Sequence, residues 1–411
     1  MSDLHEHGFK KVTRVEAARE RLRGAVTAHS RTDTLDLSVA EGRALAEPVD
    51  ARHAVPDYHR AAMDGFAVRA GDTVGASDRA PEILREVGTD GEPAEASVGP
   101  GEATRVHTGS ALPDGADAVV MVEHTDRFAG EVEVFDAVAE GENVAPPGED
   151  VEQGQRLYDA GHQLRPSDMG LLKSCGVRRV RAYERPTVGV IPTGEEVVER
   201  DPGPGEVVET NGLTISRYVE RWGGAAKYRN VVTDDEEALR AAVERDLTKD
   251  LIVTTGGSSV GERDLIPGVV DRLGEVLVHG VALKPGHPFG FGVVRDTPVL
   301  MLPGYPVACI VNAVQFLRPA IKWAGNLPLH DHPTREATLT RKVPSEPGTR
   351  TFARVTVERG EDGLEATPTR ASGSGVLSSV ALADGWVVVP ERTEGYAEGD
   401  AVSVEDWEYY A

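Results

Sequence analysis

The sequence predicts a multidomain protein in which a mostly parallel α/β sheet domain is combined with β-rich domains. The chain has 411 residues, more than one ordinary hydrophobic core organises. Strand and helix patterns alternate through residues 184–330, which favours a parallel sheet with helices on both faces. Short alternating runs, interrupted by Gly, Pro and Asp, precede and follow this region and are typical of β structure.

Within the α/β region, strands and helices follow one another with clear signals. The runs "TVGVIPTG", "KYRNVV", "DLIVTT", "EVLVHGVAL", "FGFGVV" and "PVLML" predict strands. The expected helices cover Thr210 to Trp222, a segment from the capping box Thr233–Glu236 to about Arg245, Asp264 to Leu273, and about Val307 to Trp323.

The N-terminal segment has helix signals. Thr13 to Glu16 has the pattern of a capping box, which predicts a helix running to about Ala28. A second helical piece is expected near Leu37 to Ala46. Residues 141–183 are rich in turn residues, and their pattern becomes helical around residues 167–174.

The β-rich regions lie on either side of the α/β pattern. Runs such as "MDGFAVRAGD" and "ADAVVMVEH" predict a β-rich domain from about Pro56 to Phe135. From about Pro333, the runs "TFARVTV" and "WVVVPE" predict a small β-barrel or sandwich.

Composition excludes several classes of protein. The net charge of −24 leaves no basic face for duplex nucleic acid. No run of about 18 apolar residues predicts a membrane span, and the charged N-terminus lacks the apolar core of a signal peptide. We expect Cys175 and Cys309 to be reduced packing residues in a cytoplasmic protein. Dispersed acid and scarce Lys suggest a halophilic protein whose self-repulsion is relieved by salt.

Four loops in the α/β region carry polar residues next to predicted strands. They are Pro192–Glu196, Thr255–Gly261 followed by Asp264, Lys284–Pro288, and Pro303–Pro306. If the sheet is parallel, these loops gather at one edge, because ligands bind outside the carboxyl ends of parallel strands.

These loops together contain the groups that phosphoryl chemistry needs. Glycines allow backbone N–H groups to approach an anion, and Lys284 supplies a positive charge. Glu195, Glu196 and Asp264 offer the hard oxygen ligands that Mg²⁺ prefers. Each loop alone also has an ordinary interpretation as a tight turn or a helix start, and "TTGGSSVGERD" matches neither the Walker A nor the dinucleotide-binding pattern.

Nine segments in order resemble the MoeA family of molybdenum-insertion enzymes, which includes the E domain of gephyrin. They are "AAMDGFAVR", "RVHTGSALPDGADAVVMVE", "NVAPPGEDV", "IPTGEEV", "VVTDDEEALR", "TTGGSSVGERD", "LKPGHPFGFG", "LPGYPVA" and "GSGVLSS". The resemblance implies insertion of molybdate into adenylylated molybdopterin, with Mg²⁺ and release of AMP.

The resemblance also implies an architecture. An elongated dimerisation domain would comprise residues 1–50 and 141–183, with a β-rich domain at 51–140 inserted between them. An α/β molybdopterin-binding domain at 184–330 and a C-terminal β-barrel at 331–411 would follow. The family's cleft lies between the α/β domain of one subunit and the β-rich domain of the other, so a homodimer is expected. A molybdopterin adenylyltransferase would be the upstream partner.

The resemblance assigns site residues by position. It implies catalytic roles for Asp64, Thr108, Asp150, Glu196, Asp235 (with Asp234 as the alternative), Asp264 and Lys284, and metal ligation by Glu196 and Asp264. It implies substrate or oxyanion contacts for Gly256, Gly257, Ser258, Ser259, Gly261, His287, Pro303, Pro306, Arg350 and Ser374.

Three positions depart from the family's pattern. Glu195 replaces an aspartate, His287 replaces the second lysine of the Lys-Pro-Gly loop, and Tyr305 replaces an asparagine in the proline turn. The changes at His287 and Tyr305 leave open molybdate or tungstate as the oxyanion. They also leave open a non-catalytic, molybdopterin-binding scaffold. A molybdopterin adenylyltransferase is a further alternative, because its fold resembles the α/β domain.

Overall fold

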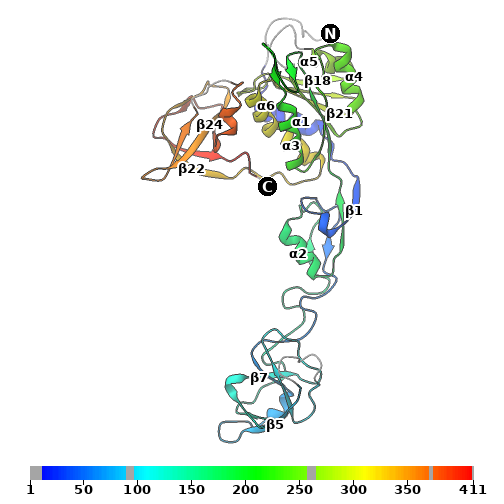
Figure 1. Ribbon diagram of the computed structural model, residues 1–411, viewed down its shortest axis with the longest axis vertical. Helices are drawn as coiled ribbons and strands as arrows, with labels where there is room; N and C mark the ends of the chain where they lie inside the picture. Colours follow the sequence, from blue (N-terminus) through cyan, green and yellow to red (C-terminus); the bar gives the residue numbers. More distant parts are fainter. Residues whose placement is uncertain (1–11, 89–96, 257–264, 370–373, 410–411) are drawn as a thin grey trace.

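The computed structural model describes residues 12–88, 97–256, 265–369 and 374–409. It is an elongated molecule in which an α/β body and a C-terminal β-barrel lie side by side at one end (Figure 1). A narrow arm leads from the body to a β-rich domain at the opposite end. The structure thus has the multidomain character that the sequence predicts.

A six-stranded sheet forms the centre of the α/β body, in the order β16-β13-β17-β21-β20-β18. The first four strands run parallel, β20 is antiparallel to β21, and β18 is antiparallel to β20. The bounds are β13 Thr187–Pro192, β16 Ala225–Tyr228, β17 Leu251–Thr255, β18 Glu275–His279, β20 Gly290–Val294 and β21 Thr297–Leu302.

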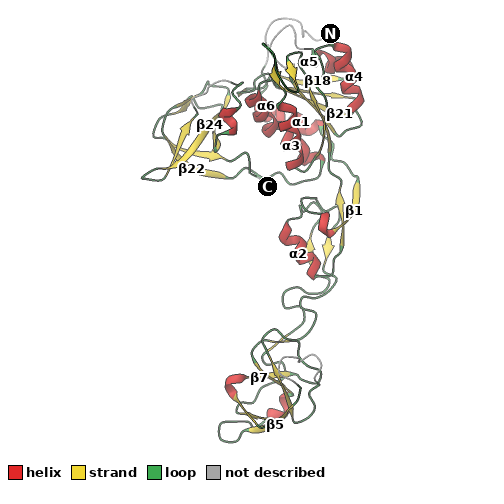
Figure 2. Ribbon diagram, in the orientation of Figure 1, coloured by secondary structure: helices red, strands yellow, loops and turns green. Residues whose placement is uncertain are grey.

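Helices cover both faces of this sheet because its strands are apolar on both faces (Figure 2). In β17, Leu251 and Val253 belong to one hydrophobic core, whereas Ile252 belongs to the other. The larger core packs under α1, α3, α6, the π-helical segment η5 and α7, and the smaller one under α4 and α5. The bounds are α1 Val15–Ala25, α3 Asn211–Arg221, α4 Glu236–Asp246, α5 Ile266–Leu273, α6 Pro306–Asn312, η5 Ala313–Leu317 and α7 Arg318–Ala324.

Helix α1 belongs to this body by packing, although it precedes the arm in sequence. Its buried residues Val15, Ala18 and Leu22 lie in the larger core. The expected capping box is wrong. Arg14, not Thr13, is the N-cap residue, and its side chain makes no capping hydrogen bond. The backbone of Thr13 instead pairs with the segment around Val281: Thr13 N donates to Gly280 O at 3.0 Å, and Ala282 N donates to Thr13 O at 2.8 Å.

The arm consists of an outgoing and a returning pass of the chain that pair with each other three times. The antiparallel pairs are β1 Thr32–Asp36 with β12 Arg179–Tyr183, β2 Val49–Asp50 with β11 Arg156–Tyr158, and β3 Arg60–Ala61 with β10 Val144–Ala145. Helix α2, Pro166–Ser174, packs beside them as expected.

The helix expected near Leu37 to Ala46 is wrong apart from a short 3-10 turn, η1 Leu37–Val39. The backbone N–H groups of this segment pair instead with the returning pass. Leu37 N donates to Arg178 O at 2.9 Å, and Leu45 N donates to His162 O at 2.9 Å. Long-range pairing has therefore replaced local helix formation.

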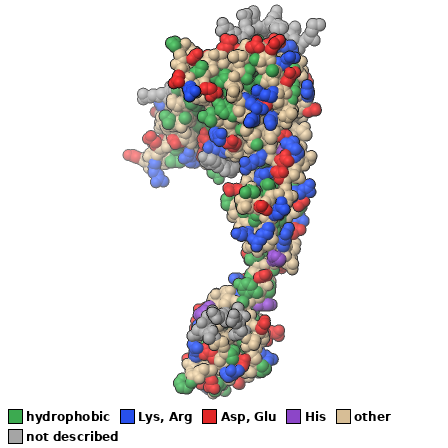
Figure 3. All heavy atoms as spheres, turned by 45° about the vertical axis from the view of Figure 1, so that its right-hand side comes forward, with side chains coloured by type: hydrophobic (Ala, Val, Ile, Leu, Met, Phe, Trp, Pro, Cys, Tyr) green, Lys and Arg blue, Asp and Glu red, His purple; other side chains and the backbone are tan. Residues whose placement is uncertain are grey.

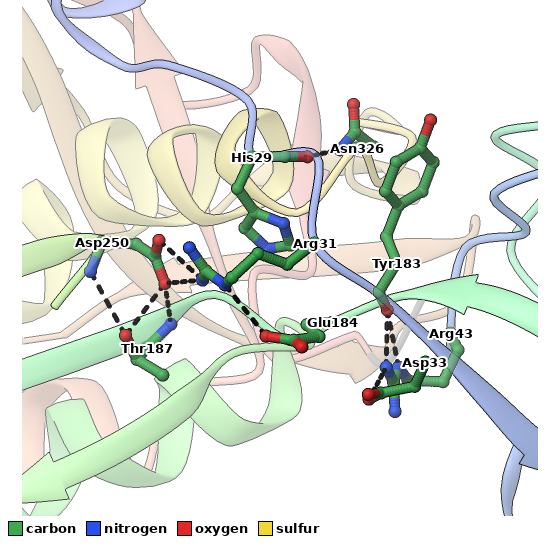
Figure 4. A network of polar contacts seen from close by, with 9 residues as sticks. All are labelled: His29, Arg31, Asp33, Arg43, Tyr183, Glu184, Thr187, Asp250 and Asn326. Atoms are coloured by element: carbon green, nitrogen blue, oxygen red, sulfur yellow. Dashed lines mark hydrogen bonds and ion pairs between the residues drawn. The ribbon is translucent and has the colours of Figure 1, made fainter.

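An ion-pair network fixes the arm where it meets the body (Figure 4). Arg31 Nη2 donates to both carboxylate oxygens of Asp250 at 2.8 Å, and Arg31 Nε donates to Glu184 at 2.9 Å. Asp250 also accepts from Thr187 N at 2.7 Å and from the Thr187 hydroxyl at 2.9 Å. Arg31 of the outgoing pass therefore connects Glu184 of the returning pass to the partly buried Asp250 carboxylate, which Thr187 of the sheet also contacts.

At the far end, the inserted domain contains a six-stranded, mainly antiparallel sheet in the order β7-β4-β6-β5-β9-β8. Its core includes Phe66, Leu84 and Val120. The bounds are β4 Gly65–Val68, η2 Ala70–Thr73, β5 Glu82–Glu86, β6 Glu102–Val106, β7 Ala118–Met121, η4 Val122–His124, β8 Thr125–Phe128 and β9 Glu131–Val134.

The C-terminal domain is a closed barrel of five strands, as expected. The order is β24-β25-β22-β28-β26, and β26 pairs with β24 to close the ring. Strand β19, Leu283–Lys284, extends from the body and pairs with β24. The bounds are β22 Thr334–Leu339, β24 Arg350–Arg359, β25 Leu364–Pro368, α8 Ser378–Ala381, β26 Gly385–Val389 and β28 Ala401–Glu405. Two short strands of this domain, β23 Val343–Pro344 and β27 Gly395–Tyr396, pair with each other. In the body, β14 Val197–Val198 pairs with β15 Val207–Val208.

Cys175 and Cys309 are both buried, and neither forms a disulfide, as predicted for packing residues. On the face drawn in Figure 3, acidic and basic side chains are interspersed rather than gathered into one patch. Through the described ranges, every helix is too short or too polar to span a bilayer.

Candidate active site

Three parallel strands of the body end together at one edge of the sheet. Pro192 of β13 is paired with Thr255 of β17, and Thr255 is paired with Leu302 of β21. The loops that begin at Thr193, Gly256 and Pro303 therefore start side by side. The predicted site residues Gly257, Ser258, Ser259, Gly261 and Asp264 lie outside the described residues.

Gly256 occupies a position that only glycine fills without strain. Its φ is +128°, and a Cβ there would lie 2.2 Å from the carbonyl oxygen of Thr193. Gly256 N donates to Leu302 O at 3.2 Å. Gly256 is thus held between the ends of β13 and β21.

The Lys-Pro-Gly-His loop reaches the same edge as expected. It lies between β18 and β20, whose residues His279 and Gly290 are paired, and Gly290 is also paired with Met301 of β21. Gly286 is fixed by Asn312 of α6, whose Nδ2 donates to Gly286 O and to Ala308 O, both at 2.9 Å. The Lys284 ammonium is exposed and lies 3.3 Å from Glu346 Oε1 of the barrel.

Carboxylates gather in the turn after β13. Glu195 and Glu196 are exposed there, and Asp234 lies close enough to interact with both. Partial burial raises the pKa of Asp234; a hydrogen bond from the Glu195 backbone lowers it, but the charges of Glu196 and Glu195 raise it further, so the net pKa is raised. Asp235 instead caps α4, since its Oδ1 accepts from Ala238 N at 2.9 Å. Of the two adjacent aspartates, Asp234 is the one that faces the acidic turn.

The proline turn joins this edge to the barrel. Pro306 begins α6, and Val307 N donates to the carbonyl of Ser374 at 3.0 Å. Tyr305 is exposed, and its ring lies against Gly375. Ser374 and Pro306 are therefore neighbours, as their assignment to one site requires. The turn is also held from α3, where Asn211 Nδ2 donates to Gly304 O at 2.7 Å.

Arg350, the other barrel residue in the predicted set, has carboxylate partners within the chain. Its guanidinium lies 2.6 Å from Glu16 of α1 and 3.1 Å from Glu391. These ion pairs join α1 to the barrel, so the observed role of Arg350 is a link between domains. His287 is half-buried in the loop below Lys284, and its carbonyl accepts from Val281 N at 3.0 Å.

The remaining predicted residues lie at the other end of the molecule. Asp64 Oδ1 accepts from Thr108 N at 2.7 Å and from the Thr108 hydroxyl at 2.9 Å. These two donors lower the pKa of the exposed Asp64 carboxyl. Asp150 is exposed in the returning pass, next to the Glu149 carboxylate that pairs with Arg60 at 2.6 Å.

One chain does not bring these two sets together. Asp64 and Thr108 belong to the β-rich domain, and Lys284, Pro303 and Asp234 belong to the body at the opposite end of the arm (Figure 1). The predicted site residues therefore form two separate groups within a single chain.

Two positioning residues, Asn211 and Asn312, were not singled out from the sequence. Asn312 could have been found, since it is one of two amides, with Gln315, in the apolar run "VACIVNAVQF" of a helix. An amide is costly in such a core unless it is hydrogen-bonded, which suggests a partner backbone. Asn211 has no comparable signal in the sequence.

The Mg²⁺ predicted from sequence can be compared with the donors at this edge. Across residues 12–88, 97–256, 265–369 and 374–409, no group of three or more His, Cys, Asp or Glu is arranged to hold a metal ion. Asp234, Glu195 and Glu196 nevertheless form a cluster of negative charge, and the two glutamates contribute to the raised pKa of Asp234. Such a donor set fits Mg²⁺, which keeps several waters and shares its coordination with substrate phosphates.

Comparison with known proteins covers nearly the whole chain. Family models match at residues 13–176, described as the MoeA N-terminal region (domain I and II), at 189–323, described as "Probable molybdopterin binding domain", and at 336–407, described as the MoeA C-terminal region (domain IV). The chain is 35% identical to a Bacillus subtilis protein named molybdopterin molybdenumtransferase, over 91% of this chain and 89% of that one. It is 33% identical to molybdopterin molybdenumtransferase 2 of Mycobacterium tuberculosis, over 91% and 94%.

A solved structure agrees with the fold as well as the sequence. The molybdopterin biosynthesis MoeA protein from Pyrococcus horikosii superposes with a TM-score of 0.82 at 34% identity, covering 97% of this chain and 99% of that one. With its multidomain fold, its closed C-terminal barrel and these matches, the chain belongs to the MoeA family.

Proposed function

We propose that this chain is a molybdopterin molybdenumtransferase of molybdenum cofactor biosynthesis. It takes adenylylated molybdopterin and molybdate or tungstate, releases AMP, and leaves the metal on the dithiolene sulfurs. The observation that carries the proposal is the sheet edge, which holds the exposed Lys284, the strained Gly256 at the end of β17 and a cluster of three carboxylates. Cation, backbone donors and carboxylates are what a metal-assisted phosphoryl site requires.

The residues of the edge have separate roles in this proposal. Gly256 lies at the start of the segment that binds the phosphate end of the substrate in this proposal. The Lys284 ammonium neutralises charge on the leaving phosphate or the incoming oxyanion, in competition with Glu346. Asp234, rather than Asp235, holds Mg²⁺ together with Glu195 or Glu196, because Asp235 is occupied by its helix cap. Bound Mg²⁺ neutralises developing phosphate charge.

The acidic set at the far end supports a site shared between subunits. Asp64 is already ionised and oriented by Thr108, but nothing at its own end supplies the glycine loop or Lys284. We propose a homodimer in which Asp64, Thr108 and Asp150 of one copy face the sheet edge of the other. We further propose that this dimer is cytoplasmic and receives its substrate from a molybdopterin adenylyltransferase.

AMP release from adenylylated molybdopterin tests the reaction. The assay would contain Mg²⁺, molar KCl, and molybdate or tungstate. Oxyanion-dependent release, reduced by Asp234→Asn and by Asp264→Asn, is expected, and the preferred anion identifies the metal. Tight binding of the substrate with no AMP under either anion would reject the transferase in favour of a scaffold. A requirement for ATP would indicate an adenylyltransferase.

Subunit mixing tests the shared site separately. Asp64→Asn and Asp234→Asn chains, each inactive alone, would be unfolded together and refolded as mixed dimers. If each site takes one residue from each copy, half of the dimers carry one intact site, so about a quarter of wild-type activity should return. No recovery from well-folded mixed dimers would place both residues in a site within one chain.

A further inference from the structure

A second polar cavity lies away from the sheet edge, between the body and the barrel. Its volume is about 540 Å³. One wall is formed by α1 and by η5 and α7, which continue α6, and the other by barrel strands β24, β26 and β28. The linker around residues 329–334 closes one side. We call this cavity the interdomain groove.

Two arginines in the groove have no acidic partner. Arg318 of α7 is 6% exposed, and its Nη2 donates to the backbone carbonyl of His330 at 2.6 Å. Arg19 of α1 is half-buried, and its Nε donates to Gln315 O at 3.1 Å. Among the described residues, no carboxylate oxygen lies within 4.0 Å of either guanidinium.

The other nitrogens of these guanidinium groups remain available. None of them is among the fully buried side-chain atoms that lack a hydrogen bond, so they keep contact with solvent in the groove. Carbonyl acceptors hold each arginine in place by one nitrogen and leave the rest of the planar group free. This arrangement suits bidentate contact with an oxyanion.

The groove lining carries charges of both signs, with four arginines (Arg19, Arg23, Arg318 and Arg350) and three carboxylates (Glu20, Asp331 and Glu405). Burial lowers the pKa of Arg318, and the charge of Arg19 lowers it further; Lys322, buried one turn along α7, has a pKa lowered to about 8 by burial and by Arg318. Asp331 and Glu405 oppose this charge only from a distance, and Glu405 already accepts from Trp386 Nε1 at 2.7 Å.

Arg350, which also lines the groove, is neutralised by Glu16 and Glu391 and does not need a further anion. Clustering of unpaired cations is unfavourable in itself. It occurs here in a chain with a net charge of −24, so an excess of basic residues does not explain it.

Each wall of the groove contributes one aromatic side chain. Trp323 of α7 carries the Arg23 guanidinium 5.1 Å from its ring centroid, and Phe352 of β24 lies on the opposite wall. A flat apolar group can therefore lie in the groove beside the two arginines. The space is far larger than a single oxyanion and matches small-molecule sites in volume.

We infer that the interdomain groove is a binding site for a phosphate-bearing small molecule, held by Arg19 and Arg318 and bridging the body to the barrel. The site is separate from the sheet edge, and the inference does not depend on the proposed transferase activity. The bridged elements are those that support the candidate active site, since α7 continues the helix that begins at Pro306 and β24 pairs with the strand ending at Lys284. A ligand here would tighten that support.

Calorimetric titration of the full chain with inorganic phosphate and with phenyl phosphate, at constant ionic strength, tests the site. Saturable binding is expected, and Arg19→Gln and Arg318→Gln should each weaken it by about tenfold or more. Arg240→Gln, an exposed position on α4, is the matched control and should leave binding unchanged. Trp323→Leu distinguishes the sources of phosphate: weakening of phenyl phosphate alone indicates an organic phosphate, and equal affinities indicate the free anion.

Two results would overturn the inference. One is the absence of saturable binding by either probe in wild-type protein. The other is binding that is lost in Lys284→Gln but retained in Arg19→Gln, which would place the phosphate at the sheet edge instead. Because Arg318 is deeply buried, Arg19→Gln is the decisive variant if Arg318→Gln lowers the melting temperature strongly.

Discussion

At the sheet edge, Gly256 and Gly286 are enclosed by neighbouring backbone and by the buried amide of Asn312, whereas at the far end of the arm Asp64 and Thr108 are exposed and hold each other by two hydrogen bonds. The first region is positioned by packing and the second by local polar contacts. Substitutions at the edge should therefore change stability as well as activity, and substitutions at the far end should change activity alone.

The largest effect is expected from Gly256→Ala. Its Cβ would meet the Thr193 carbonyl at 2.2 Å, in a backbone conformation with φ of +128°. We expect a loss of about 4 kcal/mol or more in the free energy of unfolding, measured by denaturant titration. Gly109→Ala, in the Thr108 loop, is the matched control, because it has a φ of +86° but no atom within 4 Å of its Cβ. Its cost should be about 1 kcal/mol, and equal losses at the two sites would break the comparison.

Asp64→Asn should lower the rate of AMP release by about 100-fold, because a charge already oriented by Thr108 is removed. The free energy of unfolding should change by no more than about 0.5 kcal/mol at this exposed position. Since the two Thr108 donors lower the pKa of Asp64, the carboxylate stays charged below the usual titration range of aspartate. Protonation of Asp64 should therefore not reduce activity between pH 7 and pH 5, because even the ordinary aspartate pKa is about 4. A large drop in stability for Asp64→Asn would show that the far loop is also positioned by packing.

Arg31→Met tests the junction between the two regions. Removal of Arg31 leaves the partly buried Asp250 with only its Thr187 donors. The expected cost is about 1–2 kcal/mol, moderated because Arg31 is itself half-exposed. The exposed pair of Arg179 with Asp36 is the control, and Arg179→Met should cost less than about 0.5 kcal/mol.

The stability cost of Arg31→Met should depend on pH in a defined direction. Burial raises the pKa of Asp250, but the Thr187 and Arg31 donors outweigh burial and the net pKa is lowered. The resulting stability is present above the ordinary aspartate pKa of about 4 and is lost as pH falls through the folded-state value. The difference in free energy of unfolding between wild type and Arg31→Met should therefore become smaller below about pH 4. A difference that stays constant with pH would show that Arg31 does not act through the charge of Asp250.

Potassium chloride should produce the smallest and most general effect. With a net charge of −24, the chain should melt at a higher temperature as salt screens self-repulsion. The difference between wild type and Gly256→Ala should stay the same, because steric strain is not screened. Melting temperatures that are flat from low to molar KCl would contradict the halophilic interpretation of the composition.

Local signals in the sequence predicted the central strands β13, β17 and β21 well, because these strands are apolar on both faces. The edge strand β16 was predicted less well, since it covers Ala225–Tyr228 rather than residues 227–232 and is mostly exposed. The failures occurred where distant backbone competed for the same groups. Thr13 pairs with the segment around Val281 instead of capping α1, and the N–H groups of Leu37 and Leu45 pair with the returning pass. The exposed Lys284 loop was placed at the correct edge, although it precedes an antiparallel strand, which a parallel-sheet argument does not reveal.

The candidate site shows the same limit at the level of single residues. Adjacent aspartates at positions 234 and 235 are equivalent by sequence pattern, and only the capping bond of Asp235 to Ala238 separates their roles. Arg350 was predicted to be available to an anion. The Glu16 and Glu391 carboxylates that occupy it come from segments more than 300 and about 40 residues away, and no local pattern encodes them.

Because the two passes of the arm pair with each other, the domain beyond them can be deleted from the protein. Arg60 and Ala145 are partners in an antiparallel pair, so the chain enters and leaves the β-rich domain through adjacent points. Partners in such a pair are about 5 Å apart, a gap that a two-residue hairpin turn closes. The β-rich domain can therefore be deleted as a unit. A two-residue turn that joins residues 60 and 145 would close the arm as a β-hairpin.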